Sequence, residues 1–375
     1  MIGGEQVKRV PWDGVAYTRR AREGPCLVCS LLAGDPSYRH HILYESEHVV
    51  AFLVPRPTLW GYAIVAPKQH AERLVEDLSL TEYLDLQAVV YRVAGGIAKT
   101  VPTERVYVLS LGSQQGNAHV HWHVAPLPPG LPYERQQYFA LMAEHGVLTP
   151  TWEQLGELAA AARPHIAARP DDPKLHPRAA GEDTGGHLPP GGLSRSQPDP
   201  IVPQYLDLGT VAPGRFDGTA MVRLAREGPC FVCATLAGHP EYPHHILYQD
   251  ADVVAFLARR PTLMGATIVA PTRHAERLEA DLTLTEHLHL HHVTYQLGRA
   301  LSTVLPTERI YVLSLGSQQG NAHVHWGIAP LPPGVPYEHQ QFHATIGGTG
   351  NLSPTPQQQQ RLADALRAQL RAPDL

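Results

Sequence analysis

One segment of the chain occurs twice, and the rest of the sequence is interpreted around it. Residues Tyr107–Trp122 read YVLSLGSQQGNAHVHW, and residues Tyr311–Trp326 repeat that segment without a change. The first copy continues as HVA from His123, whereas the second continues as GIA from Gly327. A duplicated run of regularly spaced histidines is more typical of a reactive site than of a duplicated core. The single His/Gly difference indicates that the two copies no longer do the same work.

The repeat extends outward at a constant offset of 204 residues. The shared segments include AREGPC (Ala21 and Ala225), HHILY (His40 and His244), VVAFL (Val49 and Val253) and PLPPG (Pro126 and Pro330). An offset of this length without insertions indicates a tandem duplication and excludes a solenoid. We predict one domain in residues 1–168, a flexible Pro/Gly-rich linker in 169–206 and a second domain in 207–375.

The bulk composition is that of an ordinary globular protein. The 375 residues are 43% hydrophobic and 17% charged, with a formal net charge of −5. An acidic chain lacks the basic surface that binds polymeric nucleic acid, so we expect none as a partner. No apolar run approaches the roughly 20 residues that span a bilayer, and the start MIGGEQVKRVPWDG lacks the apolar stretch of a secretory signal. We therefore predict a cytoplasmic protein with no membrane partner.

The local patterns predict an α+β fold. In copy one, strands are expected over residues 42–53, 62–67, 105–111 and 119–125. Ser79 and Glu82 form a capping-box pattern that opens a helix running to about Thr100. Because few strands are separated by helices of crossover length, an antiparallel sheet with helices is favoured over a doubly wound parallel sheet.

Two other helical segments carry distinctive side chains. The segment QQQQRLADALRAQLRA near the C-terminus places Leu362, Leu366 and Leu370 on one side, so we expect it to pack on copy two. Four histidines cluster on the predicted helix of copy two: His287, His289, His291 and His292. Their counterparts in copy one are Tyr83, Asp85, Gln87 and Ala88, so a shared ligand role has no support. We interpret this cluster as a solvated helix face.

The three histidines of copy one alternate with apolar residues. On a strand, His119, His121 and His123 would share one face, with the apolar residues packed behind them. In one interpretation a neutral imidazole attacks phosphorus, and the Gly-rich turn before it holds phosphate oxygens. In another, a His-x-His pair binds a catalytic metal. The third interpretation is a half-buried strand without chemistry.

The cysteines form two Cys-x-x-Cys pairs, Cys26/Cys29 and Cys230/Cys233. In a reducing compartment this spacing indicates a metal site or a redox pair, and it argues against structural disulfides.

These motifs resemble the histidine triad (HIT) superfamily, whose signature is His-φ-His-φ-His-φ-φ. Copy one fits every position of that signature, and the resemblance continues upstream through CLVC, VVAF and GYAIVAPKQH at residues 61–70. It implies two tandem domains, each an antiparallel sheet with helices. Small members of the superfamily pair as homodimers through their sheets. The resemblance therefore implies an intramolecular pseudo-dimer, and we expect a monomeric chain.

The resemblance also implies an enzyme, a nucleotide hydrolase or nucleotidyltransferase. His121 would attack the α-phosphorus of a nucleoside phosphate ester, anhydride or phosphoramidate, forming a nucleotidyl-imidazole that water releases. His123 would hydrogen-bond phosphate oxygens, and Gln115 would face the phosphates. The remaining candidates are His119 and His325 in the catalytic set and Ser113, Asn117, Gln319 and Asn321 in the substrate-binding set. The expected partner is a nucleotide or another phosphorylated small molecule.

By the same resemblance, each domain would hold one structural zinc ion, with no organic cofactor. The four ligands would be Cys26, Cys29, His70 and His119 in copy one. In copy two they would be Cys230, Cys233, His274 and His323. Four nitrogen and sulfur ligands make a closed tetrahedral site.

The sequence departs from the family at several positions. The Asp or Asn that usually follows the VVAF strand is Val54 in copy one and Ala258 in copy two. The Ser or Thr that often follows the glutamine is Gly116, and Tyr62 stands where a His is usual. The base, the sugar and the leaving group therefore stay open. Because Gly327 replaces the third histidine, we expect copy two to be attenuated; the alternative is drift with both sites active.

Two function classes compete with this interpretation. One is a nucleotide-binding module with little turnover, and the other is a metal-dependent hydrolase that uses the His-x-His strand. Against the second, no Asp or Glu stands near the triad to complete an open catalytic site. A galactose-1-phosphate uridylyltransferase also has two related halves, but the His-Pro-His motif of that family is absent here.

Overall fold

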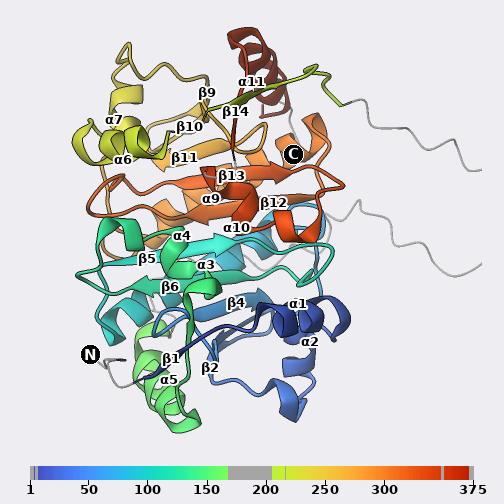
Figure 1. Cartoon of the computed structure of the whole chain (residues 1–375), viewed down its shortest axis with the longest axis vertical. Helices are drawn as coiled ribbons and strands as arrows, with labels where there is room; N and C mark the ends of the chain where they lie inside the picture. The colour runs from blue at the N-terminus through green and yellow to red at the C-terminus, as the bar shows by residue number, and fades with distance from the viewer. Residues whose placement is uncertain (1–3, 5–6, 168–204, 216, 348–349, 371–375) are drawn as a thin grey trace, which may run out of the picture.

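A single antiparallel sheet of ten strands runs through both copies (Figure 1). The computed structural model describes residues 4, 7–167, 205–215, 217–347 and 350–370. The strand order is β2-β3-β4-β6-β5-β12-β13-β11-β10-β9. Copy one contributes β2 (Ile42–Glu45), β3 (Val49–Leu53), β4 (Ala63–Pro67), β5 (Arg105–Ser110) and β6 (Trp122–Leu127). Copy two contributes β9 (Ile246–Gln249), β10 (Val253–Leu257), β11 (Thr267–Pro271), β12 (Arg309–Ser314) and β13 (Trp326–Leu331).

The two copies join where β5 pairs with β12. Leu109 lies opposite Leu313, and these residues hold the same position in their copies under the offset of 204. Equivalent residues that face each other across an antiparallel pair lie on a local two-fold axis. The predicted α+β class and the pseudo-dimer arrangement within one chain are therefore confirmed.

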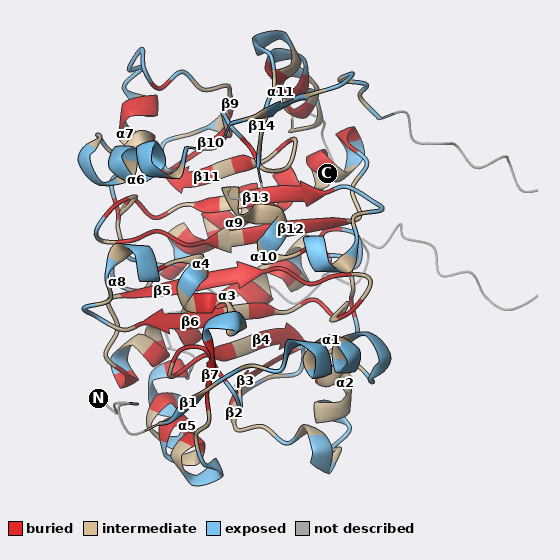
Figure 2. Cartoon of the chain, viewed as in Figure 1, coloured by how far each residue is buried: buried red, intermediate tan, exposed pale blue. Residues whose placement is uncertain are grey.

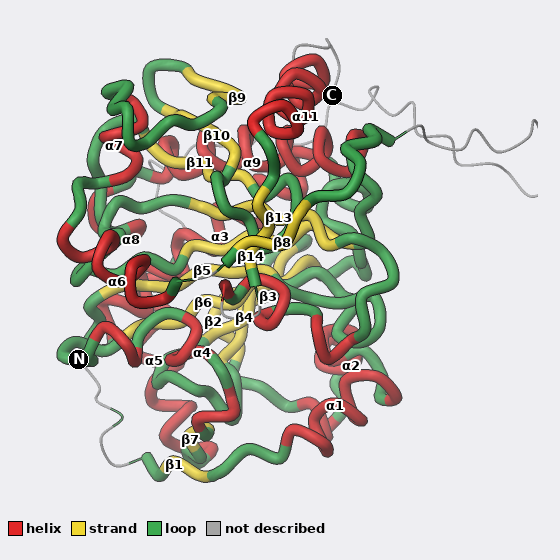
Figure 3. The backbone as a smooth tube through the Cα atoms, turned by 45° about the horizontal axis from the view of Figure 1, so that its top comes forward, coloured by secondary structure: helices red, strands yellow, loops and turns green. Residues whose placement is uncertain are grey.

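Two long helices pack on one face of the sheet and against each other. They are α3 (Leu80–Thr100) and α9 (Leu284–Val304), and both begin at a capping box, Ser79 with Glu82 and Thr283 with Glu286. Figure 3 shows the helices around the central strands. The other α-helices are α1 (Gly14–Glu23), α2 (Leu27–Leu32), α4 (Tyr138–Leu141), α5 (Trp152–Ile166), α6 (Gly218–Glu227), α7 (Phe231–Leu236), α8 (Leu278–Asp281), α10 (Phe342–Thr345) and α11 (Pro356–Leu370).

Short elements complete the two copies. Two small sheets form from β1 (Arg9–Val10) with β7 (Val147–Leu148) and from β8 (Ala212–Gly214) with β14 (Asn351–Ser353). Single 3₁₀ turns are η1 (Pro36–Tyr38), η2 (Tyr133–Arg135), η3 (Ala143–His145) and η4 (Tyr337–His339).

The predicted strand boundaries differ from the structure in two places. The strand expected over residues 42–53 is two strands, because the chain turns at Ser46, whose N–H donates to the Val49 carbonyl at 2.9 Å. The strand expected from His119 begins at Trp122. His119 and His121 therefore precede the strand, and His123 alone of the three lies within it.

The sheet separates two apolar layers, visible as buried segments in Figure 2. Trp122 and Val124 belong to a core that contains residues of α3 and α9 and extends through both copies. Ala125 and Leu127 belong to a second cluster on the opposite side of the strand. Because neighbours on a strand alternate in direction, His123 shares the face of Ala125 and Leu127, away from the long helices.

The histidine cluster of copy two is not a solvated face, and that prediction was wrong. His287 and His291 are fully buried, and the Tyr83 hydroxyl hydrogen-bonds His291 Nδ1 at 2.7 Å. The reason is that α9 packs against α3 at the junction of the copies, which buries a second face of the helix. His289 stays partly exposed and lies 3.0 Å from an Asp250 carboxylate oxygen.

These two buried histidines predict a loss of stability in acid. Burial lowers the pKa of His287 to about 3 and holds the pKa of His291 well below its ordinary value of 6.5. The unfolded chain binds these protons near pH 6.5 while the folded chain does not, so the unfolding free energy falls as pH drops below about 6.5. For His287 the loss by about pH 4.5 is on the order of 2 kcal/mol.

Urea unfolding at pH 7.5 and 4.5 measures this loss. Replacing both buried histidines with glutamine, the residue that copy one has at Gln87, should make the stability less dependent on pH. The exposed His165→Gln on α5 is the matched control. An unchanged pH dependence in the double variant would show that other groups cause the acid effect.

The ends of the two copies are partly described. Residues 169–204 of the predicted linker lie outside the described residues. In copy two, α11 packs on α9 and β9 with Leu362 and Leu366 buried, which confirms the predicted docking of the C-terminal helix. Among the described residues, no helix combines the length and the apolar character needed to cross a membrane.

Candidate active site and metal centres

The candidate nucleophile follows a tight turn between β5 and β6. The turn is closed by a bridge between Ser113 and Gly116, and Asn117 follows in the left-handed region with φ of 56°. His121 Nδ1 donates to the carbonyl oxygen of His119 at 2.7 Å. This bond places the proton on Nδ1, so the lone pair of the neutral ring is on Nε2. Burial lowers the pKa of His121 to about 4, and the imidazole is therefore neutral at pH 7.

His123 lies beside the candidate nucleophile. Its ring centroid is 4.8 Å from that of His121, with the planes at 80°. Tyr62 presents its ring edge-on to His123 at 5.6 Å, so it takes part in the packing of the site. Among the described residues, His123 Nδ1 is buried without a hydrogen-bond partner. An orphaned buried nitrogen of this kind needs water or a ligand, as a group that binds phosphate oxygens does.

The predicted substrate-binding side chains of copy one hold the turn together. The Gln115 N–H donates to Ser113 Oγ at 3.0 Å, and Ser113 is fully buried. Gln115 Nε2 donates to the Val335 carbonyl of copy two at 2.8 Å. Asn117 Nδ2 donates to the Tyr17 hydroxyl at 2.7 Å. The structure places these three residues next to the nucleophile, and their contact with phosphate stays a prediction.

Copy two repeats the geometry around its central histidine. His325 Nδ1 donates to the His323 carbonyl at 2.7 Å, and burial lowers the pKa of His325 to about 4. Gln319 Nε2 donates to the Leu131 carbonyl of copy one at 2.8 Å, and the Asn321 N–H donates to Ala225 at 3.3 Å. The nucleophile geometry is therefore retained in copy two.

The surroundings of His325 differ from those of His121. Phe231 packs edge-on against His325 at 5.1 Å, where copy one has Leu27. At Gly327 an added Cβ would meet only Leu313 atoms within 4 Å, both at 3.8 Å. Copy two therefore lacks the third imidazole and has open space in its place.

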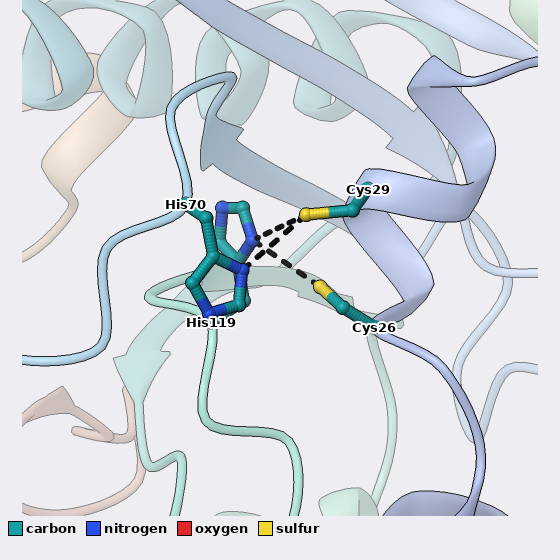
Figure 4. A group of neighbouring side chains, drawn as sticks. All are labelled: Cys26, Cys29, His70 and His119. Atoms are coloured by element: carbon teal, nitrogen blue, oxygen red, sulfur yellow. Dashed lines mark hydrogen bonds between the residues drawn. The ribbon is translucent and has the colours of Figure 1, made fainter.

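Both predicted metal clusters are assembled in the structure (Figure 4). In copy one, Cys26 Sγ lies 3.3 Å from His119 Nδ1, and Cys29 Sγ lies 3.3 Å from His70 Nδ1. The ligand atoms of each cluster lie within 4.8 Å of one another. A tetrahedral zinc ion separates sulfur and nitrogen ligands by about 3.5 Å, given Zn–S of about 2.3 Å and Zn–N of about 2.0 Å. The four side chains therefore fit the ion. Copy two matches, with Cys230, Cys233, His274 and His323.

The outer nitrogens of the histidine ligands are also oriented. His119 Nε2 donates to the Pro67 carbonyl at 2.9 Å, and His70 Nε2 lies 3.1 Å from a Glu72 carboxylate oxygen. Such partners fix the ring so that Nδ1 faces the metal. Burial and the neighbouring Cys26 raise the pKa of Cys29 to about 11. A thiol of this kind is a poor redox nucleophile, whereas a bound cation favours the thiolate.

Two arginines that the motif reasoning missed reach the triad segments. Arg309 Nη1 donates to the Ala118 carbonyl at 2.9 Å, and Arg105 Nη1 donates to the Ala322 carbonyl at 2.8 Å. Each arginine comes from the opposite copy. The available signal was a charged residue at the same position of both copies, opening the buried strands RVYVLS and RIYVLS.

The comparisons with known proteins agree with this site. The HIT domain family model matches residues 36–129, which include His70 and the whole triad of copy one. The adenosine 5'-monophosphoramidase hnt1 of Schizosaccharomyces pombe is 33% identical over 107 residues, 28% of this chain and 74% of that protein. The protein hit of Bacillus subtilis is 32% identical, over 28% of this chain and 70% of that protein.

One solved structure is similar over nearly the whole chain. It is an ADP-glucose phosphorylase from Arabidopsis thaliana with bound ADP-glucose, at 12% identity and a TM-score of 0.50. The match covers 96% of this chain and 99% of that one, so the likeness concerns the fold of both copies together. With the sequence relatives, the family model and the assembled triad, the chain belongs to the histidine triad (HIT) family.

Proposed function

We propose that the protein is a nucleotide hydrolase or nucleotidyltransferase that uses His121 as its nucleophile. The observation that carries the proposal is the His121 imidazole, neutral and with Nδ1 bonded to the His119 carbonyl at 2.7 Å. That arrangement leaves Nε2 available to attack phosphorus. The monophosphoramidase named among the relatives supports a nucleoside phosphate derivative as the substrate class.

In the proposed reaction, a bond forms between His121 Nε2 and the α-phosphorus as the bond to the leaving group breaks. The leaving group departs with the electron pair and takes up a proton. Water, or another acceptor hydroxyl in a transferase, then attacks phosphorus and displaces the imidazole, which restores neutral His121. His123, with its unpartnered Nδ1, would donate to a phosphate oxygen and stabilise the charge that develops in the transition state.

The Cys₂His₂ clusters would each hold a structural zinc ion. In copy one the ion would join α2, through Cys26 and Cys29, to the segment that leads into the nucleophile, through His119. No step of the proposed reaction passes through it.

The metal-dependent alternative has less support. His119 is directed at the cysteine pair, and the metal-binding groups found among the described residues include neither His121 nor His123. An open catalytic metal site needs about three protein ligands, which this strand does not offer.

Hydrolysis of a small substrate panel tests the proposal. The panel contains adenosine phosphoramidate, a dinucleoside polyphosphate and a nucleoside-diphosphate sugar, with initial rates measured for wild type and His121→Ala. Turnover of at least one member that depends on His121 is expected. Tight binding of nucleotide without turnover would instead support a binding module.

We further propose that copy two is attenuated because it lacks the third histidine. Loss of one preorganised donor typically costs about 10²–10³ in rate. In a chain carrying His121→Ala, the additional Gly327→His should raise turnover by at least about tenfold, because the position is open toward Leu313. Gly327→Ala in the same chain is the control. An equal rise with alanine, or no rise in a folded double variant, would contradict this explanation.

A further inference from the structure

The two copies exchange a buried arginine. Arg309 opens β12 in copy two and is 4% exposed, yet its guanidinium donates to the Ala118 carbonyl of copy one. Arg105 opens β5 and is 1% exposed, and it donates to the Ala322 carbonyl of copy two. A buried guanidinium needs polar partners, and in both cases the partner observed is the backbone just before the first triad histidine.

The turn lies directly against this guanidinium. An added Cβ at Gly112 would come 2.3 Å from Arg309 Nη2, and one at Gly316 would come 2.4 Å from Arg105 Nη2. No side chain fits at either position without displacing the arginine. The glycine at the start of the turn therefore allows the close approach of an arginine from the other copy.

A second contact from copy two holds the same turn. Gln115 Nε2 donates to the Val335 carbonyl, and an added Cβ at Gly116 would lie 3.2 Å from the Tyr337 ring. The turn of copy one thus meets copy two at both of its ends, at Gly112 and at Gly116.

We propose that Arg309 is a positioning residue for catalysis at His121. The inference rests on the proposed function of that histidine. Arg309 holds the Ala118 carbonyl, the next residue is His119, and the His119 carbonyl orients the His121 ring through Nδ1. A planar guanidinium fixes this backbone more rigidly than a single flexible donor would. Copy two, although it lacks the third histidine, thereby supplies part of the copy-one site.

The symmetry of the exchange provides a matched pair of variants. Arg309→Met and Arg105→Met remove equivalent guanidinium groups from equivalent buried positions, so both should lower the thermal stability to a similar extent. Arg309→Met should lower kcat for the best substrate of the panel by about tenfold or more, with a smaller change in KM, because the nucleophile is misplaced. Arg105→Met should lower kcat much less. Arg309→Lys should recover part of the loss.

Hydrogen exchange gives a readout that does not depend on turnover. Arg309→Met should speed amide exchange in residues 112–121, and Arg105→Met should speed it in residues 316–325. Peptides must include His123 or Gly327, because residues 107–122 and 311–326 are identical. Equal loss of kcat in the two methionine variants, or exchange that rises equally in both segments, would overturn the positioning role. An inactive wild type with segment-specific exchange would instead count against the proposed function alone.

Discussion

Replacing His121 with alanine is expected to lower kcat at least about 10³-fold on any substrate that the wild type turns over. The removal of a covalent nucleophile leaves only the contribution of binding and of the remaining donors, as nucleophile deletions in other enzymes show. Initial rates at saturating substrate measure the effect. Nucleotide affinity of the variant should change little, because the side chain that is lost acts on the transition state.

The matched control for this experiment is His325→Ala. The two histidines have the same backbone bond at 2.7 Å and similar pKa values of about 4. The proposal that copy two is attenuated requires His325→Ala to retain most of the total turnover. If the two single variants lost activity equally, both copies would be active and the asymmetry would be disproved.

Loss of the copy-one metal cluster is the second large effect. The variant Cys26→Ser with Cys29→Ser should reduce bound zinc from two ions per chain to one and lower the unfolding free energy by several kcal/mol. Turnover should fall as well, because His119 both belongs to the cluster and orients His121 through its carbonyl. Metal analysis by mass spectrometry and thermal unfolding are the measurements.

Copy two again provides the control for the zinc experiment. Cys230→Ser with Cys233→Ser should remove the other ion with a comparable loss of stability. The fall in turnover should be smaller, since this cluster adjoins His325. Purified wild type that is stable and active without zinc would contradict the structural role assigned to both clusters.

The features that follow from local patterns could be predicted from the sequence. The capping box at Ser79, the β-branched strand from Arg105 and the two metal clusters were all predicted as the structure has them, apart from shifts of a residue at element ends. The duplicated segment also predicted a sheet shared by both copies, because the resemblance supplied the way in which such domains pair.

The features that depend on the junction between the copies were not predicted. His287 and His291 are polar residues on a helix, and only the packing of α9 on α3 shows that they are buried. Arg105 and Arg309 have no motif, and their targets Ala322 and Ala118 lie in the other copy, 217 and 191 residues away along the chain. Alternation along a strand likewise misplaced the start of β6, because His119 turns toward the cysteines.

The most direct test of the central claim is to trap the covalent intermediate. The enzyme is mixed with the best substrate of the panel, quenched at high pH, where phosphoimidazole bonds survive, and digested for mass spectrometry. The account predicts a nucleotidyl adduct on His121, in peptides that extend to His123 and so differ from those of copy two, which extend to Gly327. An active enzyme with no adduct on His121, or with the adduct mainly on His325, would contradict it.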